Sequence, residues 1–187
     1  MASLLLPIIY LAFISLGLPD ALLGAAWPTM YPQLGAQVSW AGGVSMIISA
    51  CTILSALASD RLNERLGTGR VTAISVATTA AALLGFSFCH AFWQLCLWAI
   101  PYGLGAGSVD AALNNYVALH YKSRHMSWLH CMWGVGASLG PVIMGQALAG
   151  SGWQGGYRII GILQVVLTVV LLFSLPLWKL PQDAMGG

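Results

Sequence analysis

The chain has 187 residues, of which 58% are hydrophobic and only 6% charged, with a formal net charge of +2 and a mean hydropathy of +0.81. A soluble domain carries roughly a quarter charged residues, so this chain has too little polar surface to stay in water. The composition therefore indicates an integral membrane protein. No basic patch suited to nucleic acid is present in the sequence.

Six segments are long and apolar enough to cross a bilayer, which takes about 20 residues each. They are residues 4–30, 38–58, 71–89, 92–119, 126–149 and 157–178. The first and fourth are longer than a bilayer needs. The first contains Pro7, Gly17 and Pro19, and the fourth contains Pro101, Gly103, Gly105 and Gly107. A break in a transmembrane helix is tolerated where neighbouring protein or a water-filled cavity supplies hydrogen-bond partners for the unpaired backbone N–H and C=O groups. We therefore expect these two helices to be broken and to line a cavity.

The basic residues are distributed unevenly between the connecting segments. Those after the second, fourth and sixth spans hold Arg61, Arg65, Arg70, Lys122, Arg124 and Lys179, whereas the opposite side has only Arg158. Basic residues near span ends remain in the cytoplasm. The distribution predicts that both termini are cytoplasmic.

An internal repeat relates the first three spans to the last three. A shift of 90 residues places Gly17 on Gly107 and Asp20 on Asp110, so that GLPDALL is matched by GSVDAAL. Because each unit has three spans, the second copy enters the membrane from the opposite side. The predicted fold is thus all-α, with six transmembrane helices in one bundle over residues 1–187, built from inverted repeats of about 4–89 and 92–178. Chance similarity between apolar helices is the alternative.

Asp20 and Asp110 are the two carboxylates expected at membrane depth, where a charged residue is costly and is a candidate for function. Burial in low dielectric raises the pKa of a carboxylic acid, so that it can exchange a proton near neutral pH. We therefore assign proton coupling to both residues. Asn114 and Asn115 follow Asp110 closely and are candidates for binding a substrate. The alternative is a structural acid paired across helices.

Enzymatic and metal-binding motifs are not found. The four cysteines form no CxxC pair, and His120, His125 and His130 are spaced by five residues, which rotates them around a helix. The sequence has no phosphate-binding loop and no nucleophile elbow. We expect no metal, no cofactor and no enzymatic activity.

The segment SDRLNERLGTGRV between the second and third spans resembles the loop signature of the major facilitator superfamily. The chain as a whole resembles the N-terminal six-helix half of such a transporter. The resemblance implies a conformational gating role for Asp60, Arg61 and Arg70. Ordinary anchoring by basic residues on the cytoplasmic side is the alternative.

The segment VDAALNNY resembles the E-T-A-A-N-P stretch of the fucose–proton symporter branch of that superfamily. This resemblance implies proton coupling at Asp110 and sugar binding at Asp20. His130 falls at a sugar-facing position of that branch. Trp133, one turn further along, is a candidate for stacking on a sugar ring, although both residues also suit a packed core.

The fifth span carries Gly136, Gly140, Pro141 and Gly145, which resemble a glycine motif of antiporters. Small residues four positions apart also allow close helix packing. We favour packing over an antiport role.

Together the resemblances imply proton-coupled uptake of a small polar solute, such as a sugar, by alternating access between two six-helix bundles. The expected partners are the lipid bilayer, the solute, protons and a second bundle, either another copy of the chain or a C-terminal half. The expected location is a bacterial inner membrane. The alternatives are half of a drug or metabolite efflux transporter, a structural subunit without transport, and a truncated fragment.

Overall fold

The computed structural model describes residues 2–176 and 178, and the regular structure of these residues is helical. The helices are α1 (Ala2–Gly17), α2 (Leu22–Leu34), α3 (Trp40–Leu66), α4 (Thr68–Ser87), α5 (Phe92–His120), α6 (Ser123–Ala149) and α7 (Trp153–Phe173). Within the described residues, five segments are long and apolar enough to span a membrane, with α1 and α2 counted as one and α5 outside the set. α5, which corresponds to the fourth predicted span, packs against α3 and α4. The predicted all-α membrane class is confirmed.

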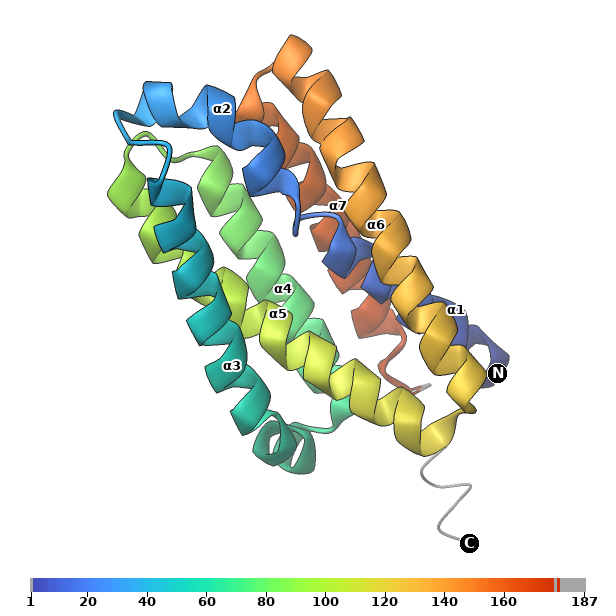
Figure 1. Cartoon of the computed structure of the whole chain (residues 1–187). Coiled ribbons are helices and arrows are strands. Elements are labelled where there is room, and N and C mark those ends of the chain that lie inside the picture. Colours follow the sequence, from blue (N-terminus) through green and yellow to red (C-terminus); the bar gives the residue numbers. More distant parts are fainter. Residues whose placement is uncertain (1, 177, 179–187) are drawn as a thin grey trace, which may run out of the picture.

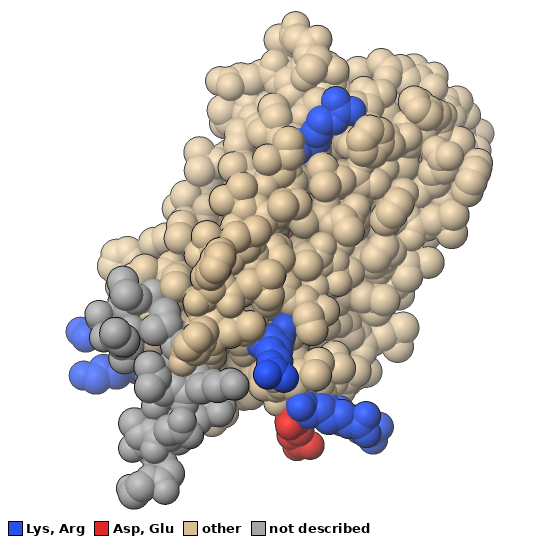
Figure 2. Space-filling view, turned by 180° about the vertical axis from the view of Figure 1, so that it is seen from behind, with Lys and Arg blue, Asp and Glu red and all other residues tan. Residues whose placement is uncertain are grey.

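The long helices run back and forth along roughly one direction, and α2 lies obliquely across one end of the molecule (Figure 1). The α3–α4 and α5–α6 connections lie at the end of the molecule where α1 begins (Figure 1). Most of the Lys and Arg side chains in view gather at this end, and one lies near the opposite end (Figure 2). We call the end with the α3–α4 and α5–α6 connections the basic end.

The helices of the first and fourth predicted spans each pack on a helix of the other predicted repeat, and the repeat itself remains a prediction. α1 packs most closely on α6, and α5 packs most closely on α3. A Cβ atom on Gly17 would overlap the Trp133 carbonyl oxygen of α6, and one on Gly107 would overlap the Thr52 carbonyl oxygen of α3. Glycine thus allows close backbone approach at both positions, 90 residues apart.

The expected break in the first span is present, because α1 ends at Gly17 and α2 begins at Leu22. Pro19 has no N–H, so the Ser15 carbonyl four residues earlier lacks its helical donor. The side-chain amide of Gln164 on α7 donates to this carbonyl instead. Such a substitute is what a broken helix needs inside a membrane, where water is absent.

The apolar core is divided near this break. One cluster gathers around α2 and includes Leu18, Leu22, Trp27, Trp153 and Tyr157. The other lies toward the basic end and includes Leu5, Phe13, Leu16, Val117 and Leu171. The break between α1 and α2 therefore lies where the two clusters meet, and it carries Asp20.

The expected break in the fourth span is absent, and that prediction was wrong. α5 is continuous from Phe92 to His120, with Pro101 inside it. The glycines that follow are used for packing: a Cβ on Gly103 would lie 2.6 Å from the Ile48 carbonyl oxygen, and one on Gly105 2.7 Å from that of Ser75. They bring α5 close to α3 and α4 without interrupting it.

The segment expected to form a loop between the second and third spans is also largely helical. α3 continues to Leu66, and Gly67 alone joins it to α4. The residues after Asp60 are mostly good helix formers, so the helix extends beyond the apolar span. Gly67 has a φ of +85°, which glycine adopts without strain.

Candidate transport site

Two cavities adjoin at Asp20. The first, which we call the acidic cavity, has a volume of about 420 Å³. It is lined by Phe13, Leu16, Asp20, Ile48, Thr52, Tyr102, Ala106, Asp110, His130 and Trp133. The second, which we call the apolar cavity, has a volume of about 690 Å³ and shares Asp20, Ile48 and Tyr102 with the first.

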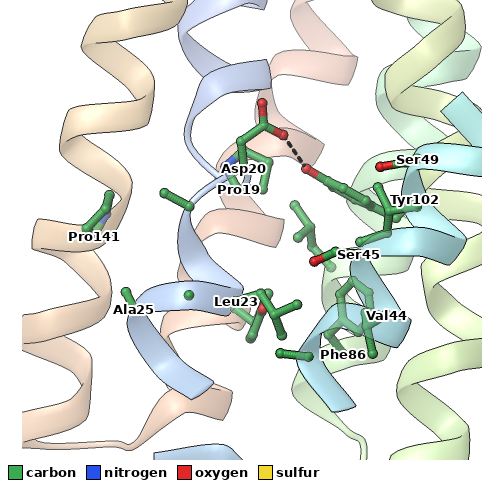
Figure 3. A pocket seen from close by; sticks show the side chains of 16 residues that line it. Pro19, Asp20, Leu23, Ala25, Val44, Ser45, Ser49, Phe86, Tyr102 and Pro141 are labelled. Carbon is green, nitrogen blue, oxygen red and sulfur yellow. Dashed lines mark hydrogen bonds between the residues drawn. The ribbon is translucent and has the colours of Figure 1, made fainter. Parts of the chain in front are cut away.

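The apolar cavity lies between the α1–α2 break and α3. Its walls are mostly hydrophobic and include Leu23, Val44, Leu83 and Phe86. Figure 3 shows Asp20 reaching toward the Tyr102 hydroxyl. Polar groups are few in this cavity, so it suits an apolar or amphipathic molecule better than a strongly hydrated one.

Asp20 is held by two donors from other helices. The Tyr102 hydroxyl of α5 donates to Oδ1 at 3.0 Å, and the Trp133 indole N–H of α6 donates to Oδ2 at 2.9 Å. A carboxylate at membrane depth is costly unless its oxygens are paired. These two bonds offset that cost, and they connect the first predicted repeat to the second.

Asp110 lies on α5 and lines the acidic cavity with Tyr102 and Ala106, at four-residue intervals along one helix face. Its Oδ1 accepts a hydrogen bond from Asn114 Nδ2 at 3.0 Å, and the same amide donates to the Asp110 carbonyl at 2.8 Å. Within the described part of the chain, the carboxylate makes no hydrogen bond to another helix. A carboxylate offers about four acceptor positions, so most of those on Asp110 are available to a proton or a solute.

His130 and Trp133 bring α6 to the acidic cavity. His130 packs edge-on against Phe13, with ring centroids 6.4 Å apart and planes at 89°. A neutral imidazole both donates and accepts hydrogen bonds. Trp133 is 39% exposed. Because its indole N–H is already bonded to Asp20, only the face of its ring is open to a ligand.

The other predicted site residues lie outside this cavity. Asn114 binds Asp110 instead of forming the wall, and Asn115 is exposed on α5 and lines neither cavity. Asp60 and Arg61 lie on the last turns of α3 and Arg70 lies on the first turn of α4, all of them exposed. Their gating role remains a prediction.

Sequence reasoning missed three polar residues of this region. Tyr102 and Thr52 line the acidic cavity, and Gln164 completes the α1–α2 break. The position of Tyr102, two turns before Asp110, was the available signal. Thr52 and Gln164 have no comparable signal, because their partners lie on distant segments.

Residues 9–184 of the chain match the sequence model of the Major Facilitator Superfamily. The matched range includes every residue that lines the two cavities. A comparison with curated proteins found no match.

Proposed function

Because the chain belongs to the Major Facilitator Superfamily, whose members are in general secondary transporters, we propose that it moves a small polar solute together with protons. In this proposal, the chain forms one of the two bundles between which the solute binds. The basic end faces the cytoplasm, as the distribution of Lys and Arg favours. The resemblance of VDAALNNY to the fucose–proton symporter branch supports a sugar as the solute.

The observation that carries this proposal is the shared position of Asp20 and Asp110 in the acidic cavity. The two acids differ in their surroundings. Asp20 has two donors from other helices, whereas Asp110 has one donor from its own helix. We assign proton exchange first to Asp110, because its unpaired acceptor positions are open to a proton.

The solute is assigned to the space between Asp20, Asp110 and His130. Carboxylate and imidazole groups match the hydroxyl groups of a sugar, and the Trp133 ring offers an apolar face. The cavity of about 420 Å³ lies within the size range of small-molecule sites. Uptake of a monosaccharide would use all four residues.

A second bundle is needed to close the cavity in this proposal. α3 and α6 both border the acidic cavity and leave large apolar side chains exposed, such as Met46, Leu57 and Val142. These faces suit either a C-terminal half of a longer protein or a second copy of the chain, which would form a two-fold pair. Native mass spectrometry of the detergent-solubilised chain separates these cases.

The test is transport into proteoliposomes containing the purified chain, with a panel of radiolabelled monosaccharides and an imposed proton gradient. We expect Asp110→Asn to abolish proton-driven accumulation while retaining the melting temperature. Glu64→Gln is the matched control, because Glu64 is an exposed acid near the basic end and lines neither cavity. Accumulation by Asp110→Asn at the wild-type level would refute the assignment.

The apolar cavity supports a second candidate function, the export of drugs or metabolites. Its volume of about 690 Å³ and its hydrophobic walls suit amphipathic cations, with Asp20 as the counter-charge. Thermal protection by apolar cations and not by monosaccharides would favour export. Protection by neither class, with no transport, would favour a structural subunit.

A further inference from the structure

A third cavity lies at the basic end, beside the junction of α3 and α4. It has a volume of about 530 Å³, and we call it the basic cavity. Arg65 and Arg70 contribute to its walls from the two sides of Gly67, and Tyr116 contributes from α5. Among the described residues, no Asp or Glu lines it, so its charged groups are positive.

The first turn of α4 forms one wall of this cavity through Thr68, Gly69 and Arg70. α4 has no side-chain cap at its N-terminus, and its Val71 N–H is the amide that bonds to the Gly67 carbonyl, at 3.1 Å. The preceding N–H groups of such a helix have no helical acceptor. Together with the helix dipole, they favour an anion at this end.

Tyr116 supplies an independent indication of a ligand. Its side chain is 2% exposed, yet its hydroxyl has no hydrogen-bond partner within the described part of the chain. The ring packs against those of Trp178 and His120, with centroid distances of 4.9 Å and 4.4 Å, respectively. A buried hydroxyl without a partner is unfavourable, so an acceptor brought by a ligand would satisfy it.

We propose that the basic cavity binds a phosphate group. Two guanidinium groups, a helix N-terminus and a phenolic hydroxyl are all donors, and the oxygens of a phosphate accept bonds from each of them. At the membrane surface the phosphate belongs either to an anionic lipid headgroup or to a soluble phosphate compound. This site is separate from the two cavities around Asp20, so it can be tested without reference to transport.

The experiment measures ligand binding to the full chain by native mass spectrometry and by melting temperature. The probes are dihexanoyl phosphatidylglycerol, dihexanoyl phosphatidylcholine and inorganic phosphate. The variants are Tyr116→Phe and the double change Arg65→Gln with Arg70→Gln. Arg124→Gln is the matched control for charge, because Arg124 is exposed near the basic end and does not line the cavity.

We expect Tyr116→Phe to weaken phosphate binding about tenfold, as expected for the loss of one bond to a charged group. The double arginine variant should lose more, and Arg124→Gln should change the affinity less than about twofold, since exposed charges are screened. Without a probe, Tyr116→Phe should melt at or above the wild-type temperature, because it removes an unpaired buried hydroxyl.

The probes distinguish the source of the phosphate. Tight binding of phosphatidylglycerol with weak binding of inorganic phosphate supports a lipid headgroup, and the reverse supports a soluble phosphate. The proposal is overturned if no probe binds, or if Tyr116→Phe binds as the wild type does. It is also overturned if Arg124→Gln weakens binding as much as the double variant.

Discussion

The contact between α1 and α6 gives a sharp test of the fold. Gly136 and Gly134 lie two residues apart on α6, but they face different surroundings. A Cβ atom on Gly136 would overlap the Ile14 carbonyl oxygen and lie 2.9 Å from its carbonyl carbon, whereas one on Gly134 would meet nothing within 4 Å. Substitution of each glycine by alanine should therefore have opposite effects.

The size of the effect follows from these distances. Gly136→Ala forces backbone atoms of α1 and α6 apart, and overpacking of this kind costs about 1–3 kcal/mol. Gly134→Ala removes the conformational freedom of a helical glycine and adds about 0.5–1 kcal/mol of stability. For a chain of this length, 1 kcal/mol corresponds to about 2–4 °C in melting temperature. We expect Gly136→Ala to melt about 2–12 °C below the wild type and Gly134→Ala slightly above it.

The assay is thermal unfolding of the purified protein in detergent, followed by the fluorescence of its eight tryptophans. The comparison between the two alanine variants cancels the effect of helix propensity. If Gly136→Ala melts at or above the temperature of Gly134→Ala, the close approach of α1 to α6 is wrong. The packing interpretation of the glycine motif would then be wrong as well.

Two further predictions concern single contacts. Gln164→Leu leaves the Ser15 carbonyl without its donor and should lower the free energy of unfolding by about 1–3 kcal/mol. Thr168→Val removes only a bond within α7 and should lower it less, so equal losses of melting temperature would contradict this role of Gln164. Cys89 is 1% exposed and its thiol donates to the Gly85 carbonyl, so maleimide should modify it slowly. The cysteine of a Ser151→Cys variant, at an exposed position, should react far faster, and equal rates would contradict the burial of Cys89.

Much of the fold was predictable because a bilayer imposes a length and a composition on each span. The broken first helix was expected from Pro19, which removes one backbone donor. Neither proline nor glycine specifies a break by itself, because Pro101 lies inside the continuous α5. In α5 the backbone stays helical, and Gly103 and Gly107 serve the approach of α3, which depends on residues about 50 positions earlier.

The candidate site was predictable in its acids and not in their partners. Asp20 and Asp110 are conspicuous because few charges occur in apolar segments. The donors to Asp20 lie 82 and 113 residues further along the chain, and nothing in the local sequence specifies such distances. Trp133 illustrates the consequence, because its expected use was ring stacking and its observed bond is from the indole N–H to Asp20.

The two donors on Asp20 also make its two oxygens unequal as places for a proton. The indole N–H of Trp133 can only donate, so a proton on Oδ2 would oppose that bond. The Tyr102 hydroxyl can turn and accept, so a proton on Oδ1 would keep both neighbours bound. Neutral Asp20 would therefore carry its proton on Oδ1, toward α5, and keep Oδ2 unprotonated, toward α6. Its charge could then change while the hydrogen bonds that join the α1–α2 break to α5 and α6 persist.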